Sequence, residues 1–307
     1  MELAWVEDFL ALVECGHFTR AAEKRNITQP AFSRRLRALE DWVGAPLFDR
    51  DTHRVELTAA GEVFKTMAEE VTRRIYLGRE QTREAARNAA ATIRFASTHA
   101  LSMTFFPQFL SSIEKHTRLD MTVSLVTDNM TGCEAIMLQG GAQFLLCHHH
   151  KSASTSLRPN HFTSVDVGHD VLMPLSVQVA EGDPRPRFAL PGTVANPVPH
   201  VAYSSTSGMG RILAAAQALD LPPTWLAAGF ASHVAAVLVT MTLSGRGMAW
   251  LPKSLVGADL DEGRLVRAGP EEFDIPIAIR IVRPRARQSP AAEQFWASVR
   301  SFAGAQD

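Results

Sequence analysis

A cluster of cationic side chains between residues 20 and 37 is the first feature of this sequence that could do chemistry. It holds six cations and one anion, a local balance of +5 in a 307-residue chain whose overall charge is −1. A basic stripe on an otherwise neutral protein indicates contact with phosphates, whereas a merely solvated helix face normally mixes both signs. We therefore expect double-stranded DNA as a partner. The members are Arg20, Lys24, Arg25, Arg34, Arg35 and Arg37, with Glu23 as the anion.

Catalytic motifs, by contrast, are missing from the sequence. Serine, histidine and aspartate all occur, but there is no Gly-x-Ser-x-Gly elbow, no HExxH pair, no phosphate loop and no dinucleotide fingerprint. Residues 207–210 read Ser-Gly-Met-Gly, and no Lys-Ser or Lys-Thr pair follows them as a phosphate loop would require. We expect neither enzymatic activity nor an organic cofactor.

A metal site is suggested only by residues 147–150, which read Cys-His-His-His, with Met130, Cys133 and Met137 as soft donors nearby. Consecutive histidines on an extended segment point to opposite faces, and methionines seven residues apart usually fill a core. The three cysteines are too few and too scattered for a disulfide framework or a zinc cluster. We expect no bound metal and reduced thiols.

The elements that must position the cations form a helix-turn-helix motif over about residues 18–37. A short helix over 18–25 is followed by a tight turn, in which Asn26 tolerates the left-handed conformation and Thr28 can cap the next helix. That next helix spans 29–43 and begins with a proline in its first turn, where the missing N–H has no consequence.

The helix over 29–43 has two distinct faces. Phe32, Leu36, Leu39 and Val43 recur at helical spacing and predict a buried stripe, while the opposite face is polar and cationic. The N-terminal half of such a recognition helix meets the major groove. Residues 46–58 predict a two-stranded wing. We expect base-edge contacts from Gln29, Pro30, Ser33 and Arg34, phosphate contacts from Arg35, Arg37, Arg50, His53 and Arg54, and a further DNA contact from Thr28.

A long helix follows, from about residue 59 to residue 90. Val63, Met67, Val71 and Ile75 recur every four residues along it. Some 30 residues at about 1.5 Å each make this helix on the order of 45 Å long. An apolar seam on so long a helix is a dimerisation device more often than a core element, so we expect it to pair two copies of the chain.

From residue 92 onward, short apolar runs alternate with helical segments. Strands are predicted over 93–97, 121–127, 143–147, 165–175, 201–204, 248–251 and 275–282, and helices over 102–116, 131–138, 207–219, 232–244 and 291–303. Such alternation predicts a mixed, largely parallel sheet with covering helices, arranged as two α/β lobes. We place lobe I at about 92–165 and 270–307, and lobe II at about 166–269.

A ligand cleft is expected where strand ends meet helix starts, because hydroxyl and imidazole groups at helix N-termini suit an anion. For any single serine or threonine, a plain capping role is the alternative. The candidate effector-binding residues are Ser97, Thr98, His99, Ser102, Asp128, Met130, Thr131, His148, Ser204, Ser205, Ser207, Met209, Ser232 and His233.

Taken together, several strings resemble the signature of the LysR-type transcriptional regulators. They are Phe18 with Ala21 and Ala22, residues 28–33, Leu36, Leu39 with Glu40, Gly44, and residues 47–50 and 57–61. Residues 106–107 and 245–252 also resemble the family's sensor domain. Residues 26–28 and 143–148 depart from the family pattern.

The resemblance implies three parts. These are a winged helix-turn-helix domain over 1–60, a linker and dimerisation helix over 58–90, and a two-lobed α/β effector-binding domain of periplasmic-binding-protein type over 92–307. It further implies a homodimer that assembles into a homotetramer, with RNA polymerase as a potential further partner.

Within the family, residues 97–102, 203–211 and 291–296 resemble the hypochlorite-responsive regulators. We expect the effector to be either an oxidant that acts on Met209 or a small carboxylate. Oxidation would turn the flexible apolar methionine into a polar sulfoxide. His233 departs from this subgroup, in which we expect another methionine at that position.

Two other protein classes are the alternatives. A periplasmic solute-binding protein would share the sensor fold, but residues 1–8 lack the basic flank and apolar run of a signal peptide. An enzyme would need a catalytic motif. The best apolar stretch, residues 234–243, is well short of the ~20 residues that span a bilayer, so no membrane association is expected and the cytoplasm is the expected location.

Overall fold

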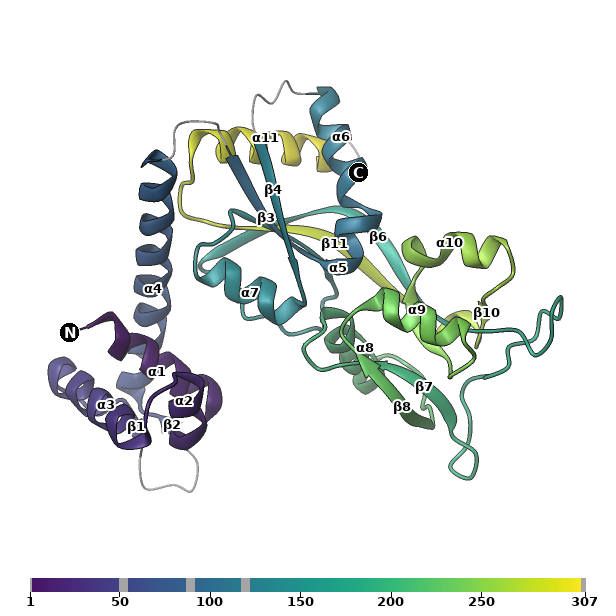
Figure 1. The fold of residues 1–307 in the computed structure, drawn as a ribbon, viewed down its shortest axis with the longest axis horizontal. Helices are drawn as coiled ribbons and strands as arrows, with labels where there is room; N and C mark the ends of the chain where they lie inside the picture. Colours follow the sequence, from purple (N-terminus) through teal and green to yellow (C-terminus); the bar gives the residue numbers. More distant parts are fainter. Residues whose placement is uncertain (1, 50–54, 87–91, 117–121, 305–307) are drawn as a thin grey trace. The chain divides into compact units, whose positions relative to one another are not determined.

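The computed structural model describes residues 2–49, 55–86, 92–116 and 122–304. The chain divides into two compact units, one of residues 1–89 with 138–141, the other of residues 90–137 with 142–307. We call them the N-terminal unit and the C-terminal unit (Figure 1).

Apolar side chains at helical spacing hold the N-terminal unit together. Phe9 and Leu12 from the first helix, with Phe32, Leu36 and Leu39 from the third, are all buried in one core. The buried stripe expected on the third helix is therefore confirmed. The elements are α1 Leu3–Cys15, α2 Phe18–Lys24, α3 Gln29–Val43, β1 Phe48–Asp49, β2 Glu56–Leu57 and α4 Ala59–Ala86.

Residues with left-handed backbone set where these helices stop. Gly16 and Gly44, with φ of 66° and 79°, end α1 and α3, and Asn26 takes a φ of 55° in the turn before α3. The left-handed turn expected at Asn26 is confirmed. Thr28 occupies the N-cap position of α3, but its side chain makes no capping hydrogen bond, so the capping role expected for it is wrong.

The wing forms where the sequence predicts it, as an antiparallel pair of β1 and β2. Its base is tied to the start of α4 by Thr58, whose hydroxyl donates to the Pro46 carbonyl (2.7 Å) and accepts from the Gly61 amide (3.0 Å). A Cβ atom on residue 61 would lie 2.1 Å from the Leu47 carbonyl oxygen, so only glycine permits this approach.

A buried carboxylate joins the first three helices of the N-terminal unit. Asp8 on α1 is fully buried and accepts hydrogen bonds from Arg25 Nε (2.7 Å) and from Arg35 on α3 (3.3 Å). Arg25 also reaches Glu7 at 2.6 Å. Because one charge on α1 holds the end of α2 and the middle of α3, it helps to set the angle at which α3 is presented.

The C-terminal unit is built on a seven-stranded sheet in the order β10-β6-β11-β5-β3-β4, with β9 also paired to β6, and on a separate parallel pair of β7 and β8. The elements are β3 Thr92–Thr98, α5 His99–Thr104, α6 Phe106–His116, β4 Thr122–Asp128, α7 Met130–Leu138, β5 Phe144–His149, β6 Phe162–Ser176, β7 Val198–Tyr203, α8 Gly208–Leu219, β8 Leu226–Ser232, α9 Ala235–Leu243, β9 Ala249–Pro252, α10 Lys253–Asp261, β10 Val266–Arg267, η1 Glu271–Phe273, β11 Ile275–Pro284 and α11 Pro290–Gly304.

Two groups of elements surround separate cores, and we call them lobe I and lobe II. In lobe I, α6 and α11 pack on β3 and β5 around Phe95, Phe144 and Phe295 (Figure 1). In lobe II, α8 packs with β7 and β9 around Ile212 and Trp250, whose indole N–H donates to the Phe273 carbonyl (2.9 Å). The strands β6 and β11 pass through both lobes.

The expectation of a largely parallel sheet is wrong. β3 pairs parallel with β4 and β5, but β11 pairs antiparallel with both β5 and β6, and β9 and β10 also pair antiparallel with β6. The reason is that β11, late in the chain, returns from lobe II and inserts between β5 and β6 in the opposite direction. A local alternation of strands and helices cannot show such an insertion.

Several further elements differ from the sequence analysis. The helix expected over 102–116 is two helices, α5 and α6. The strands β8 and β10, the helix α10 and the short 3-10 helix η1 were not expected. Within the described residues we find no helix whose length and hydropathy would let it cross a membrane.

We predict that Asp8→Ala destabilises the N-terminal unit by about 3 kcal/mol, because it leaves Arg25 and Arg35 without their buried partner. Faster amide hydrogen exchange in α1, α2 and α3 of the full-length chain measures this effect. Glu14→Ala is the matched control, because its ion pair with Lys24 is exposed and its loss costs less than about 1 kcal/mol. Equal exchange in the two variants would contradict the structural role of Asp8.

Candidate functional site

The exposed face of α3 is the first candidate site. Gln29, Pro30, Arg34 and Arg37 are exposed along it, and Ser33 is half-buried. The Gln29 side-chain amide donates to the Ser33 hydroxyl at 3.2 Å, so both groups lie on the same face. Helical spacing turns these residues away from the core because Phe32, Leu36 and Leu39 occupy the opposite side.

Half of the cations in the basic cluster are engaged inside the N-terminal unit. Arg25 and Arg35 bind Asp8, and Lys24 binds Glu14. Burial alone lowers the pKa of Arg25, but the hydrogen bonds with Asp8 and Glu7 raise it overall, so this side chain stays charged. Within the described part of the chain, Arg20, Arg34 and Arg37 form no such pair, which leaves these three to meet an external anion.

Four of the expected DNA-contacting residues need a further remark. Arg50, His53 and Arg54, which the sequence predicts as phosphate contacts, lie outside the described residues. Arg35 is half-buried and holds Asp8, so its first role in the structure is to fix α3 in place.

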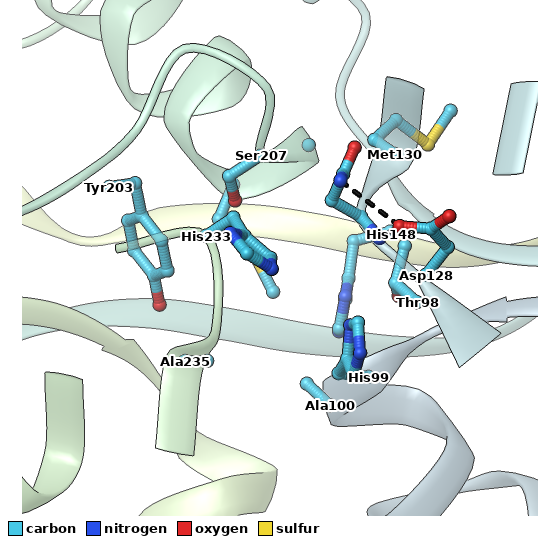
Figure 2. A pocket seen from close by; sticks show the side chains of 13 residues that line it. Thr98, His99, Ala100, Asp128, Met130, His148, Tyr203, Ser207, His233 and Ala235 are labelled. Carbon is cyan, nitrogen blue, oxygen red and sulfur yellow. Dashed lines mark hydrogen bonds between the residues drawn. The ribbon is translucent and has the colours of Figure 1, made fainter. Parts of the chain in front are cut away.

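The second candidate site is a small pocket between the two lobes of the C-terminal unit. It lies where helices begin: Thr98 and His99 open α5, Asp128 precedes α7, Ser207 precedes α8, and Ala235 opens α9. In Figure 2, Thr98, His99, Asp128 and Met130 come from lobe I, and Tyr203, Ser207, His233 and Ala235 from lobe II. The pocket has a volume of about 30 Å³, and we call it the interlobe pocket.

Three buried polar atoms in the wall of the interlobe pocket lack a hydrogen-bond partner among the described residues. They are Thr98 Oγ1, His148 Nε2 and the Tyr203 hydroxyl. Buried polar groups are nearly always paired, and those that are not often mark functional positions. Burial, and secondarily the charge of Asp170, raises the pKa of Tyr203. Its hydroxyl therefore stays a neutral donor in the wall of the pocket.

A carboxylate lies close to His148 from the neighbouring part of the sheet. Asp170 Oδ2 is 3.7 Å from His148 Nε2, too far for a hydrogen bond, and accepts from the Ser254 hydroxyl at 2.5 Å. Its other oxygen accepts from the Val171 amide (2.8 Å). Burial raises the pKa of Asp170, but the contacts with His148, Ser254 and Val171 lower it overall, so a negative charge persists behind the pocket wall.

Asp128 is folded over the start of α7 and is not a free anion in the pocket. Its Oδ1 accepts from the Asn129 backbone amide (2.6 Å) and from the Asn129 side-chain amide (3.0 Å), and the second of these hydrogen bonds is drawn in Figure 2. A Cβ atom on residue 132 would lie 2.1 Å from Asp128 Oδ2, so Gly132 permits this close packing. Because Asn129, directly before α7, already uses this carboxylate and Gly132 of α7 packs against it, the carboxylate orients the helix start.

Two methionines and two further histidines complete the interlobe pocket. Met130 and Met209 are only 7% and 6% exposed, and Met209 also belongs to the core of lobe II. The rings of His99 and His233, one from each lobe, have centroids 5.9 Å apart. Polarisable thioethers and imidazoles therefore face the same small space from both lobes.

Eight of the fourteen residues expected at the effector site line this pocket, and six do not. Several of these six make hydrogen bonds elsewhere with their side chains. The Ser97 and Ser102 hydroxyls donate to backbone carbonyls at 3.2 and 2.8 Å, and the Thr131 hydroxyl accepts from Arg211 at 2.7 Å. Those that line the pocket are Thr98, His99, Asp128, Met130, His148, Ser207, Met209 and His233; those that do not are Ser97, Ser102, Thr131, Ser204, Ser205 and Ser232.

Sequence reasoning missed five lining residues: Ala100, Asn129, Tyr203, Gly208 and Ala235. Tyr203 matters most among them, since it supplies a buried hydroxyl. Its place near the end of the strand predicted over 201–204 was a usable signal, because strand ends meet at the cleft.

The cysteines in this unit are unsuited to redox or metal chemistry. Cys133 and Cys147 are buried, and burial raises the pKa of each thiol to about 12, which keeps them protonated and unreactive. Among the described residues, no group of three or more histidine, cysteine, aspartate or glutamate side chains could hold a metal ion.

Comparison with protein families assigns both units. Residues 3–62 match the model described as "Bacterial regulatory helix-turn-helix protein, lysR family", and residues 86–304 match the "LysR substrate binding domain". The chain belongs to the LysR family. It is thus a DNA-binding transcriptional regulator with an effector-binding domain, and the expected fold class is confirmed.

Full-length relatives of the LysR family agree with this assignment. The transcriptional regulator YjiE of Escherichia coli is 27% identical over 98% of this chain and 95% of its own length. The structure of HypT from Salmonella typhimurium, described as a hypochlorite-specific LysR-type regulator, is 28% identical with a TM-score of 0.58 and covers 99% of both chains. DarR of Vibrio fischeri, solved in complex with DNA, is 28% identical with a TM-score of 0.57 over 98% of this chain and 99% of its own.

We predict that Arg34→Ala weakens binding to a preferred sequence, selected from random DNA, by about 1–3 kcal/mol, because a base-edge contact is lost. Arg37→Ala should instead weaken binding to all sequences and reduce the salt dependence by about one phosphate contact. Fluorescence anisotropy over a range of salt concentrations measures both effects. Arg246→Ala, an exposed arginine of the C-terminal unit, is the control. Unchanged affinity in both α3 variants would remove this face from DNA binding.

Proposed function

We propose that this LysR-family regulator responds to a small oxidant, such as hypochlorous acid, which enters the interlobe pocket and oxidises Met209. In this reaction the oxygen of hypochlorous acid bonds to the thioether sulfur, the O–Cl bond breaks, and chloride and a proton are released. Sulfur loses two electrons, and chlorine gains them. The product is methionine sulfoxide.

The volume of the interlobe pocket is the observation that carries this proposal. A space of about 30 Å³ holds about two water molecules. Hypochlorous acid has two heavy atoms and fits this space, whereas an organic acid of several carbon atoms does not fit unless the lobes move apart. The sequence leaves open whether the effector is an oxidant or a carboxylate, and the size of the pocket favours the oxidant.

The position of Met209 links its oxidation to a movement of lobe II. Met209 lies in the first turn of α8, lines the pocket, and packs in the core around Trp250. A sulfoxide oxygen placed in that core needs a donor, and the Tyr203 hydroxyl in the pocket wall has no other partner among the described residues. We infer that the sulfoxide shifts α8 toward the pocket, because a buried polar group left unsatisfied is costly.

The similarity to HypT supports the same proposal, since that protein is described as hypochlorite-specific. The helix N-termini around the pocket favour an anion, which is the one observation in support of a carboxylate effector. A carboxylate would have to open the pocket, and it would act without changing any methionine.

We predict that Met209→Leu abolishes the response of a bound promoter to hypochlorite, because leucine keeps the volume and removes the oxidisable sulfur. Transcription from that promoter with and without oxidant measures the response, and mass spectrometry locates the sulfoxide. Met241→Leu, away from the pocket, should respond as the wild type does. An identical response in Met209→Leu would exclude Met209, and a wild type that ignores hypochlorite would leave the carboxylate as the effector.

We further propose that the chain dimerises through α4 and assembles as a dimer of dimers. Val63, Met67 and Ile75 on this helix are 69%, 57% and 45% exposed, although they form an apolar seam. An exposed seam on a long helix is best buried by a second copy. The proposal includes a cytoplasmic location, contact with RNA polymerase at promoters, and no enzymatic activity.

We predict that the double variant Val63→Glu, Met67→Glu weakens self-association more than about 100-fold, because unpaired carboxylates would have to be buried in the seam. Sedimentation of the full-length chain measures the change in mass. Gln81→Glu adds a charge elsewhere on α4 and should leave the assembly unchanged. If the double variant sediments as the wild type does, α4 is not the dimer interface.

A further inference from the structure

A second and larger cavity lies in the C-terminal unit, beside the interlobe pocket. Its volume is about 370 Å³, within the range of small-molecule sites in proteins. Its lining comes from the end of β5, the segment 153–159, the start of β6, the first turns of α8, and the end of β11. We call it the rear cavity. Met130, His148 and Gly208 line both cavities and form the wall between them.

Apolar side chains cover a large part of the rear cavity. Leu157 and Phe162 are buried on one side, and Ile212 of α8 contributes from the core of lobe II. Val282 lies at the end of β11. A wall of this kind favours a ligand with an apolar body, because an apolar lining offers few hydrogen bonds to water molecules in the cavity.

Two of the three arginines that line the rear cavity are already neutralised. Arg211 donates to Glu134 at 2.8 Å and to Thr131 at 2.7 Å. Arg280 holds Asp166 through two hydrogen bonds of 2.6 and 3.0 Å. Arg280 thus makes a bidentate ion pair and Arg211 a single one, and each guanidinium already has a carboxylate partner.

Arg285 is the third arginine and has no carboxylate partner among the described residues. Its Nε donates to the Pro159 carbonyl at 2.7 Å, which fixes the side chain at the rim of the cavity. The two terminal nitrogens of its guanidinium have no hydrogen bond within the described part of the chain. Thr163 and Ser164 also belong to the lining. An oriented cation at the edge of an otherwise apolar cavity suits a carboxylate.

We propose that the rear cavity is a second ligand site that binds an organic monocarboxylate with an apolar body. Arg285 holds the carboxylate, and Leu157, Phe162 and Ile212 enclose the body. This site goes beyond the proposed oxidant response, because it needs neither Met209 nor a change in the interlobe pocket. Because Arg285 is a single unpaired cation among the described residues that line the cavity, we expect a ligand with one negative charge. The volume of the cavity admits an apolar body of about ten non-hydrogen atoms.

The helix α8 connects the rear cavity to the interlobe pocket. Ile212 lies about one turn along α8 from Met209, and Arg211, two residues from Met209, ties that helix to Glu134 and Thr131 of α7. A carboxylate packed against Ile212 and Arg211 therefore acts on the helix that carries the proposed sensor methionine. The monocarboxylate would tune how readily the regulator responds, as a second signal at a distinct site.

Phenylacetate is a suitable probe, and its neutral isostere phenylacetamide is the matched ligand control. In calorimetric titrations of the full-length chain, we expect phenylacetate to bind at least about tenfold more tightly than phenylacetamide, because the amide loses the charge-assisted contact. No detectable binding of phenylacetate, or equal binding of the two compounds, would overturn the proposal.

Variants of Arg285 locate the site. We expect Arg285→Gln to weaken phenylacetate binding by about tenfold or more, and Arg285→Lys to retain most of it because the charge remains. Arg287→Gln removes a nearby exposed arginine that does not line the cavity and should bind as the wild type does. Thermal unfolding checks that each variant is folded. Equal affinity in Arg285→Gln and the wild type would place the ligand elsewhere and overturn the proposal.

Discussion

The antiparallel pairing of β6 with β11 is the constraint on which the C-terminal unit depends. The two strands pair over ten positions, with one irregularity at Ile279 and Arg280. Near the start of β11, Ile275 and Ile277 enter the core of lobe II, whereas Ile279, next to the irregularity, and Ile281, beyond it, enter the core of lobe I. Because the same two strands supply both cores, the lobes cannot separate without bending this ladder, and any movement is concentrated where the strands cross between them.

The polar groups of the interlobe pocket lie near this crossing. His148 is on β5, which pairs with β11, and Asp170 is on β6. The carboxylate of Asp170 keeps its negative charge here. Three buried polar atoms nearby, on Thr98, His148 and Tyr203, have no hydrogen-bond partner among the described residues. A buried polar group without a partner costs about 1–3 kcal/mol, so groups of this kind favour a partner that can pair with them. In the proposed response, the sulfoxide would be that partner and would shift the equilibrium between arrangements of the lobes.

A buried charge has a different role in the N-terminal unit. Asp8 draws Arg25 and Arg35 inward, which removes two cations from the surface that the sequence seemed to offer to DNA. Among the residues expected to contact DNA, those exposed on α3 are a narrower set, Gln29, Pro30, Arg34 and Arg37, held at a defined angle. Fewer charges in a fixed geometry favour sequence-specific contact over general attraction to phosphates.

The sequence alone determined the family, the helix-turn-helix, the wing and most of the strands, because these depend on local periodicity and on short motifs. The inward stripe of α3 and the turn at Asn26 are read from neighbouring residues, and the structure has them where expected. Eight of the expected effector residues also line the pocket, since strand ends and helix starts can be located along the chain. Tertiary structure decided the rest. The insertion of β11 between β5 and β6, the burial of Asp8 between two arginines, and the convergence of Tyr203 with His148 all join residues far apart in sequence. Such contacts depend on how the elements pack, and no local pattern of residues records that packing.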